Sequence, residues 1–397
     1  MVPKVGKAVA VDVINGIIHD LRRARWSLLM VGVLGFCVPL MAAVLPEDRA
    51  DFLFHSYTGG GLDVHGPSVL VRKKLGEKIS VWGKYYIDSI TSATIDVVTS
   101  ASQYTEKRIE KSAGVDYLRN KAMMSFSKIN SVENDYVSNT MNFNVSQNMF
   151  GDLTTVSLGY SKGLDDIYET GNPTFRNKEN RQNYRLGISQ VLTKNLITSL
   201  NLEAITDEGY LSSPYQSVRY LVTPTTYSKQ AVKYPNTHTS HAIALNGLYY
   251  LPYRAVLKLG YRVYSDTWGI QASTYEIGYT HPIKSNWTLD INYRYYTQTH
   301  ANFYSDLFPY YNARNYLSRD KELSTFTSRA LGLKASYEFL DDGWKFIDKG
   351  SANIAYNHIM FDYKDFRDLR VSGVTPGTEP LYNFSANVLQ IFVSLWY

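Results

Sequence analysis

Alternation between apolar and polar side chains constrains the fold of this chain most strongly. In residues 136–146, Val137, Met141 and Phe143 alternate with serine, threonine and asparagine, and residues 287–296 repeat the pattern. Successive side chains of a strand point to opposite faces, so such segments predict strands that are apolar on one face and polar on the other. No stretch after residue 45 keeps a helical period. We therefore expect the rest of the chain to be all β.

The hydropathy of the chain indicates which kind of β protein this is. The sequence contains 33 Tyr and 16 Phe, yet its mean hydropathy is only -0.25. A helical membrane protein needs apolar runs of about 20 residues, whereas a membrane barrel shows every second residue to lipid. The composition therefore favours a membrane-spanning antiparallel β-barrel.

The connections between the expected strands are alternately short and long. Outer-membrane barrels have the same arrangement, with short periplasmic turns and long outer loops. We expect long loops near residues 89–105, 164–179, 208–239, 299–325 and 366–382. The expected strands lie near residues 68–75, 78–88, 105–118, 121–131, 135–147, 153–163, 180–192, 195–207, 240–251, 254–265, 269–281, 286–298, 326–340, 350–363 and 384–397. Parity requires one more strand, Asp51 to Tyr57, followed by a glycine-rich outer turn. The count becomes about 16; about 14 is the alternative if that segment lies inside the lumen.

The last nine residues predict the destination of the chain. Their outward positions are all apolar and the chain ends in an aromatic residue: Leu389, Ile391, Val393, Leu395 and Tyr397. This pattern resembles the signal by which the barrel-assembly machinery recognises outer-membrane proteins, and an aromatic end suits the membrane interface. We expect a bacterial outer-membrane location with Tyr397 at the inner rim. The first strand must then pair with the last.

The N-terminal segment predicts secretion. Arg22, Arg23 and Arg25 precede an apolar run that ends at Met41-Ala-Ala43, which is typical of a signal peptide. We expect a signal peptide over residues 1–43 and a barrel over residues 44–397. A retained membrane helix is the alternative. The only cysteine, Cys37, lies in this run, so the processed protein would hold no thiol chemistry.

Charge is spread along the chain. The net charge of +5 comes from 41 basic and 36 acidic residues without a block of one sign, so we expect no nucleic-acid partner. In a lumen, charged groups can set solute preference, or they can pair into a closed interior. About 16 strands leave room for water unless a loop or the N-terminal segment fills the bore. The charged residues expected to face the lumen are Arg108, Glu110, Asp116, Arg185, Glu203, Lys258, Arg262, Asp290, Arg294, Lys334 and Glu338.

The chain offers little sign of catalytic or metal chemistry. His238 and His241 are too few for a zinc site, and we expect them in a solvated outer loop. No Gly-x-Ser-x-Gly elbow is present. We expect no enzymatic activity, metal or cofactor.

Several segments resemble an uncharacterised family of outer-membrane barrels classed only as a domain of unknown function. The likeness is carried by Ser56-Tyr-Thr-Gly-Gly-Gly-Leu-Asp-Val-His-Gly-Pro-Ser-Val-Leu-Val-Arg-Lys73 and Tyr85-Tyr-Ile-Asp-Ser-Ile-Thr-Ser-Ala-Thr-Ile-Asp-Val-Val-Thr-Ser-Ala-Ser102. Members often accompany small lipoproteins, flavin-attaching enzymes and thioredoxin-like proteins, so the resemblance implies periplasmic or lipoprotein partners. Its polar cluster could bind calcium or form a hydrogen-bonded network that orders a loop: Asp88, Ser89, Ser92, Asp96, Ser100, Ser102 and Glu106.

Three functions remain open at this stage. A porin-like channel or transport passage fits the strand count and the mixed-charge lumen. An outer-membrane scaffold for an envelope redox or export system fits the loop lengths and the resemblance. A barrel-embedded enzyme needs a nucleophile, base and acid brought together across strands, which spacing does not show.

Overall fold

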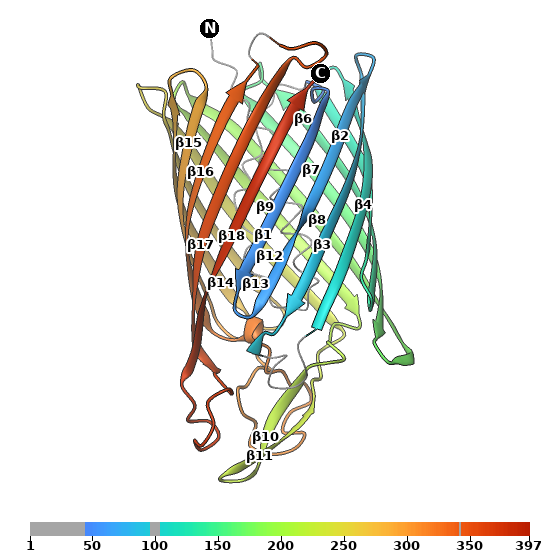
Figure 1. The fold of residues 1–397 in the computed structure, drawn as a ribbon, viewed down its shortest axis with the longest axis vertical. Helices are drawn as coiled ribbons and strands as arrows, with labels where there is room; N and C mark the ends of the chain where they lie inside the picture. The colour runs from blue at the N-terminus through green and yellow to red at the C-terminus, as the bar shows by residue number, and fades with distance from the viewer. Residues whose placement is uncertain (1–43, 96–103, 341–342) are drawn as a thin grey trace.

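The computed structural model describes residues 44–95, 104–340 and 343–397 of the chain; the expected signal peptide lies outside them. Sixteen strands of this described part form one closed antiparallel barrel (Figure 1). No helix among the described residues is long and apolar enough to cross a membrane. The barrel strands are β1 (Arg49–Gly59), β2 (Leu62–Leu75), β3 (Ile79–Ser92), β4 (Tyr104–Arg119), β5 (Ala122–Val132), β6 (Tyr136–Met149), β7 (Thr154–Glu169), β8 (Asn172–Thr193), β9 (Leu196–Gly209), β12 (Thr237–Tyr250), β13 (Val256–Asp266), β14 (Gln271–Ile283), β15 (Trp287–Gln298), β16 (Phe326–Phe339), β17 (Lys349–Arg367) and β18 (Leu381–Trp396).

The barrel closes where the sequence requires it to close. β1 pairs antiparallel with β18, with Phe54 opposite Ile391 and Leu53 opposite Phe392. The segment Asp51 to Tyr57 is therefore a wall strand, and the alternative of about 14 strands is wrong. Closure leaves no unpaired edge, which an exposed apolar strand would otherwise offer to other chains.

Most connections agree with the expected alternation of short and long. Gly60 and Gly61 form the outer turn between β1 and β2 with φ of 60° and 82°, a left-handed conformation that glycine adopts without steric cost. The loop expected at residues 164–179 is wrong, because β7 and β8 continue as a hairpin around Thr170 and Gly171. Cross-strand pairs such as Asp166 with Lys178 extend the ladder there.

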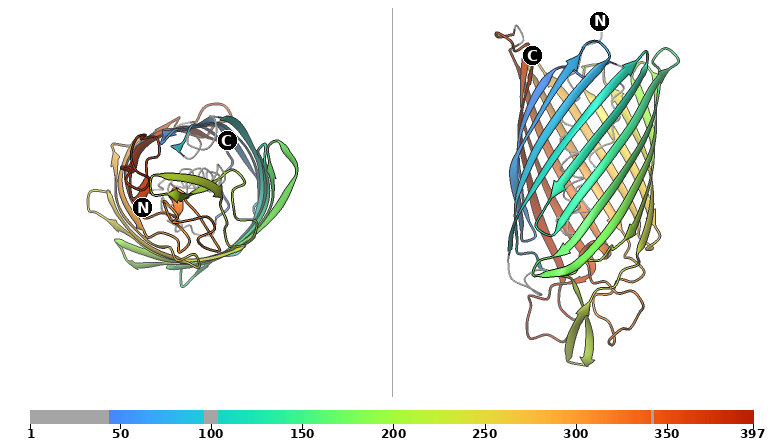
Figure 2. Two further views of the ribbon diagram at one scale, coloured as in Figure 1. Left: turned by 90° about the horizontal axis from the view of Figure 1, so that it is seen from below. Right: turned by 90° about the vertical axis from the view of Figure 1, so that its right-hand side faces the viewer.

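The long connection after β9 contains a hairpin that alternation in the wall did not predict. β10 (Ser217–Thr223) pairs with β11 (Thr226–Ala231) in a separate two-stranded sheet. Figure 2, viewed from the end that carries the long loops, shows this hairpin crossing the opening of the barrel. A short 3-10 helix, η1 (Lys321–Leu323), lies in the connection between β15 and β16.

The two faces of the wall differ as period-two alternation requires. On β1, Phe52 and Phe54 are exposed on the outer surface, while Arg49, Asp51 and His55 are buried on the lumen side. The apolar face meets lipid and the polar face lines the interior, which is the arrangement of an outer-membrane barrel.

Candidate functional site: the lumen and its loop cap

Three outer connections fold together over one end of the lumen. We call residues 210–236, 299–325 and 368–380 the loop cap. Val218, Phe308 and Leu317 in these segments are at most 1% exposed. Exposed loops rarely bury large apolar side chains so completely, so these segments form a packed unit.

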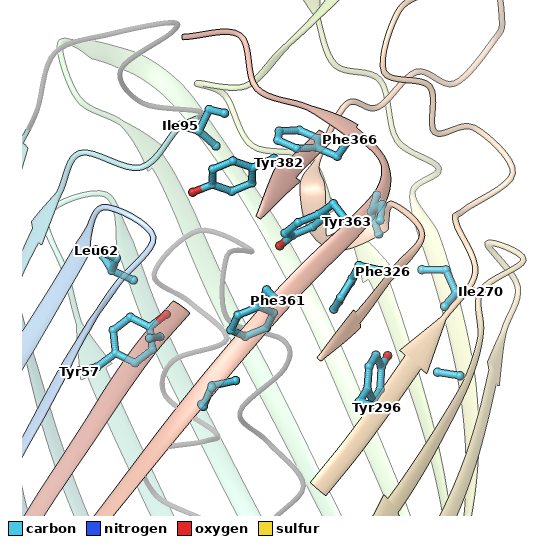
Figure 3. Packing of buried hydrophobic residues seen from close by; sticks show 14 of the residues in the cluster. Tyr57, Leu62, Ile95, Ile270, Tyr296, Phe326, Phe361, Tyr363, Phe366 and Tyr382 are labelled. Atoms are coloured by element: carbon cyan, nitrogen blue, oxygen red, sulfur yellow. The ribbon is translucent and has the colours of Figure 1, made fainter. Parts of the chain in front are cut away.

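The cap rests on aromatic side chains from the outer ends of the wall strands. Figure 3 shows Phe326, Tyr363, Phe366 and Tyr382 in one cluster beneath the loops. The ring centres of Phe326 and Tyr363 lie 5.1 Å apart, and those of Tyr363 and Tyr382 lie 5.6 Å apart. Stacked and tilted rings at this spacing attract one another beyond their burial alone. The cluster therefore fixes where the cap sits.

A buried arginine links the cap segments. Arg219 on β10 donates to both carboxylate oxygens of Glu379, at 2.5 and 3.0 Å, and its Nε donates to the backbone oxygen of Asp306 at 2.9 Å. It also forms an ion pair with the Asp306 carboxylate at 2.5 Å. We call Arg219, Asp306 and Glu379 the latch. Charge-assisted and bidentate bonds of this kind are the strongest in proteins.

Two further arginines bind the carboxylate of Asp306. Arg319 Nε donates to Asp306 Oδ1 at 3.0 Å, and the Arg367 amide donates to the same oxygen at 3.1 Å. Arg319 also donates to the Arg367 carbonyl at 2.7 Å and lies 4.2 Å from the centre of the Phe366 ring. Asp306 is thus held from several sides, while the Glu379 side chain depends chiefly on Arg219.

The pKa of Glu379 reflects this dependence. Burial raises the pKa of its carboxyl, but hydrogen bonds and charge from Arg219 outweigh burial, so the pKa lies below its ordinary value of 4.5. The Gly377 amide adds a hydrogen bond at 2.9 Å. The latch is therefore charged at neutral pH and weakens in acid.

The lumen wall formed by β9, β13 and β15 carries ion pairs that keep contact with solvent. Lys258 Nζ lies 2.8 Å from Asp290 Oδ1, and their side chains are 39% and 21% exposed. Arg262 and Glu203 pair at 3.2 Å with side chains 18% and 16% exposed. Alternation along β13 directs Lys258 and Arg262 into the lumen, because Leu259 between them lies exposed on the outer surface. Their exposure is therefore exposure to the interior of the barrel.

The opposite wall, formed by β1 to β4, is packed. Asp88 pairs with Arg108 and with His55 Nε2, the latter at 2.6 Å, and the side chains of all three are at most 4% exposed. Arg72 pairs with Asp116, and Glu110 accepts from Lys84 at 3.2 Å. Because both side chains of the Asp88–Arg108 and Arg72–Asp116 pairs are buried, this wall leaves little room for solvent around them. Ion pairs in contact with solvent and buried ion pairs thus lie on opposite walls of the lumen.

Two of the other charged residues expected in the lumen adjoin these pairs, since Lys334 is the cross-strand partner of Asp290 and Arg185 that of Glu203. Arg185 donates to Asn144 at 3.3 Å, and Arg294 is 3% exposed on β15. Lys334 on β16 is half-buried, and Glu338 is exposed at the inner end of that strand. All of them occupy lumen-facing positions of the alternation.

The polar cluster suggested by the family resemblance is divided. Asp88 and Ser92 face the lumen, and Ser89 is exposed on the outer surface. Glu106 lies further along β4, where its Oε1 accepts from the Asn134 amide at 3.0 Å. Asp96, Ser100 and Ser102 lie outside the described residues.

Glu106 belongs to another group of carboxylates at the outer rim. One oxygen each of Glu106, Glu133 and Asp135 lies within 4.8 Å of the others. Oxygen ligands of this kind suit hard cations such as calcium. Acidic groups also gather at loop ends without a metal, and here they adjoin the hydrogen bond to Asn134.

The C-terminal residues singled out by sequence lie on the outer face of β18. Ile391 is 45% exposed, and Leu389, Val393 and Leu395 are half-buried. The Tyr397 hydroxyl donates to the Arg72 carbonyl at 3.0 Å, at the rim that carries the short turns.

The two neighbouring histidines lie near an outer loop, as expected, but on β12 and not in a solvated loop. His238 lies on β12, between Asp207 and Asp266, at 3.1 Å from each. His241 is exposed on the opposite face of the same strand, so the two cannot share a ligand.

Sequence reasoning missed the latch entirely. Arg219 is 87 residues from Asp306 and 160 from Glu379. The cap segments have no repeating polarity, and nothing in them signals which side chains will meet.

Comparison with known proteins finds one family. The chain matches the family model described as "Protein of unknown function (DUF3570)" over residues 97–348. No curated protein matches the chain.

Solved structures with a similar architecture have low identity to this chain. A bacterial polysaccharide outer membrane secretin has a TM-score of 0.48 and 8% identity, over 89% of this chain and 99% of that one. OmpT, an outer membrane protein of Vibrio cholerae, has a TM-score of 0.41 and 11% identity, over 90% of this chain and 100% of that one. The siderophore receptor PirA from Acinetobacter baumannii has a TM-score of 0.42 and 11% identity, over 89% of this chain and 60% of that one.

Proposed function

The chain belongs to the DUF3570 family of proteins of unknown function, and from that premise we propose that this outer-membrane β-barrel is a porin-like passage for small charged solutes, gated by its loop cap. The observation that carries the proposal is the solvent-exposed Lys258–Asp290 pair on the lumen wall. A lumen closed by packing would bury such a pair, as the opposite wall does.

Charges of both signs along the open wall favour small ionic or zwitterionic solutes. A solute can exchange partners between Lys258, Asp290, Arg262 and Glu203 as it moves, because both ion pairs keep contact with solvent. The pairs are too exposed to bind a solute tightly, and conduction needs weak binding at several points.

The cap supports gating because polar contacts connect its segments to one another. Breaking the bond between Arg219 and Glu379 would release β10 from the connection between β17 and β18. The segment of residues 368–380 could then occupy a second arrangement relative to β10, and a gate requires such a pair of states.

Current through the purified protein in planar lipid bilayers tests the proposal. We expect small, brief openings from the wild type and longer openings from Arg219→Met. Absence of current from both proteins at every voltage would contradict a passage.

A scaffold function is the second candidate, and one observation favours it. The inner turn between β16 and β17 exposes Trp344 by 56% and Phe346 by 74%. Aromatic rings at this rim suit the membrane interface, but they also suit a periplasmic partner. Reproducible recovery of one periplasmic protein or lipoprotein with the wild type, lost with Trp344→Ala and Phe346→Ala together, would support the scaffold.

A further inference from the structure

Three lysines on neighbouring strands point outward, toward lipid. Lys111 on β4, Lys128 on β5 and Lys162 on β7 are exposed. Cross-strand partners share a face of the sheet, and the partners of these lysines include residues of the lipid-facing surface. Lys111 pairs with Tyr85, which is 43% exposed, and both Lys128 and Lys162 pair with Met141, which is 53% exposed.

The register places the three lysines close together. Lys128 and Lys162 flank Met141 in one row, and strands lie about 4.8 Å apart, so their backbones are about 10 Å apart. Lys111 pairs with Asn130, two residues from Lys128 on the same strand. Diagonal neighbours of this kind are about 7–8 Å apart, within reach of long side chains.

These lysines differ from the cations inside the barrel. Lys84, Arg72 and Arg108 each pair with a carboxylate on the lumen side. Among the described residues, none of the three outward lysines forms an ion pair. They lie in an otherwise lipid-facing wall, where a lysine without an anionic partner is destabilising.

We propose that Lys111, Lys128 and Lys162 bind the phosphates of a lipopolysaccharide molecule in the outer leaflet. The partner should be anionic, because this face carries three cations. The nearest outward carboxylate on these strands, Asp166, is already paired with Lys178 at 4.0 Å. Two phosphates joined by a sugar scaffold can meet lysines about 10 Å apart.

The patch faces the outer leaflet. Lys107 continues the basic face toward the outer end of β4, whereas Phe126, Phe143 and Leu158 occupy the outward positions toward the inner turns. Lysine side chains extend toward the nearer polar region of a membrane, which here lies on the loop side.

A second copy of the chain fits this face less well. A two-fold contact would place the same lysines of both copies opposite one another, and like charges in direct opposition are destabilising. A phosphorylated lipid instead neutralises the patch.

Native mass spectrometry of the detergent-extracted full-length protein tests the proposal. We expect the wild type to retain lipopolysaccharide, and the triple variant Lys111→Gln, Lys128→Gln, Lys162→Gln to retain at least tenfold less. Lys194→Gln, which removes an exposed lysine from the inner turn between β8 and β9, is the control and should behave like the wild type. A triple lysine-to-arginine variant keeps all three positive charges and should keep the lipid.

A second measurement separates phosphate recognition from general lipid binding. Purified lipid A added to the delipidated barrel should bind, and enzymatically dephosphorylated lipid A should not. The proposal would be overturned if the triple glutamine variant retained as much lipopolysaccharide as the wild type, or if both forms of lipid A bound equally. It would also be overturned if the glutamine variant lost a protein dimer but kept the lipid.

Discussion

Replacing Arg219 by methionine should open the loop cap without unfolding the barrel. Methionine fills much of the same space but cannot donate to Glu379 or Asp306. Asp306 keeps Arg319 and the Arg367 amide, whereas Glu379 keeps little beyond the Gly377 amide. Removing one partner of a buried ion pair costs about 3–5 kcal/mol because the other charge stays buried. The retained bonds to Asp306 favour the lower end of that range, about 3 kcal/mol.

Amide hydrogen exchange measures this local opening. A loss of about 3 kcal/mol corresponds to roughly a 100-fold faster exchange in residues 217–231 and 368–380, with the strands of the wall unchanged. Arg176→Met, the same substitution at an exposed position of the β8 hairpin, should leave exchange in the cap as it is. If Arg219→Met exchanges at the wild-type rate in both segments, the latch does not hold the cap.

Three further predictions follow from the same contacts. The pKa of Glu379 is lowered on folding. The stability that Glu379 gives the cap is therefore complete above its ordinary pKa of 4.5 and is lost as the pH falls through the lower pKa of the folded protein. Bilayer currents should grow in acid, and the Glu379→Gln variant should be open already at neutral pH and lose this response. Lys258→Glu should make the passage more cation-selective, measured as a shift in reversal potential under a salt gradient; an unchanged potential would place Lys258 outside the path. Ile391→Lys, on the lipid-facing side of β18, should lower the free energy of unfolding in vesicles by about 2–4 kcal/mol. Asn383→Lys, near the outer end of the same strand, should lower it by at most about 1 kcal/mol. Equal losses would contradict the assigned membrane position.

The wall of the barrel was predictable because its physics is local. Side-chain polarity must alternate along every lipid-facing strand, so the pattern predicts the position of each strand by itself. The even strand count required Asp51 to Tyr57 as a partner for the C-terminal strand. That pairing is present, with Phe54 opposite Ile391. The error at residues 164–179 also has a local cause. Beyond the membrane, β7 and β8 continue as a polar hairpin, where nothing forces apolar side chains onto one face.

The cap was not predictable from one sequence. Its defining contacts join Arg219 to residues far away in the chain, and a loop imposes no period that would reveal them. The direction of lumen side chains could be inferred from alternation, but their pairing could not. Arg108 and Lys258 look alike in sequence, yet one is buried against Asp88 and the other remains open to solvent.

Access of a bulky, membrane-impermeant thiol reagent to position 258 tests the gated passage most directly. The experiment uses Lys258→Cys in a Cys37→Ser background on intact cells, so that the reagent reaches the lumen only through the outer mouth. We predict slow labelling with the wild-type latch and labelling many times faster when Arg219→Met is added. Equal rates with and without the latch would contradict a cap that closes a water-filled passage.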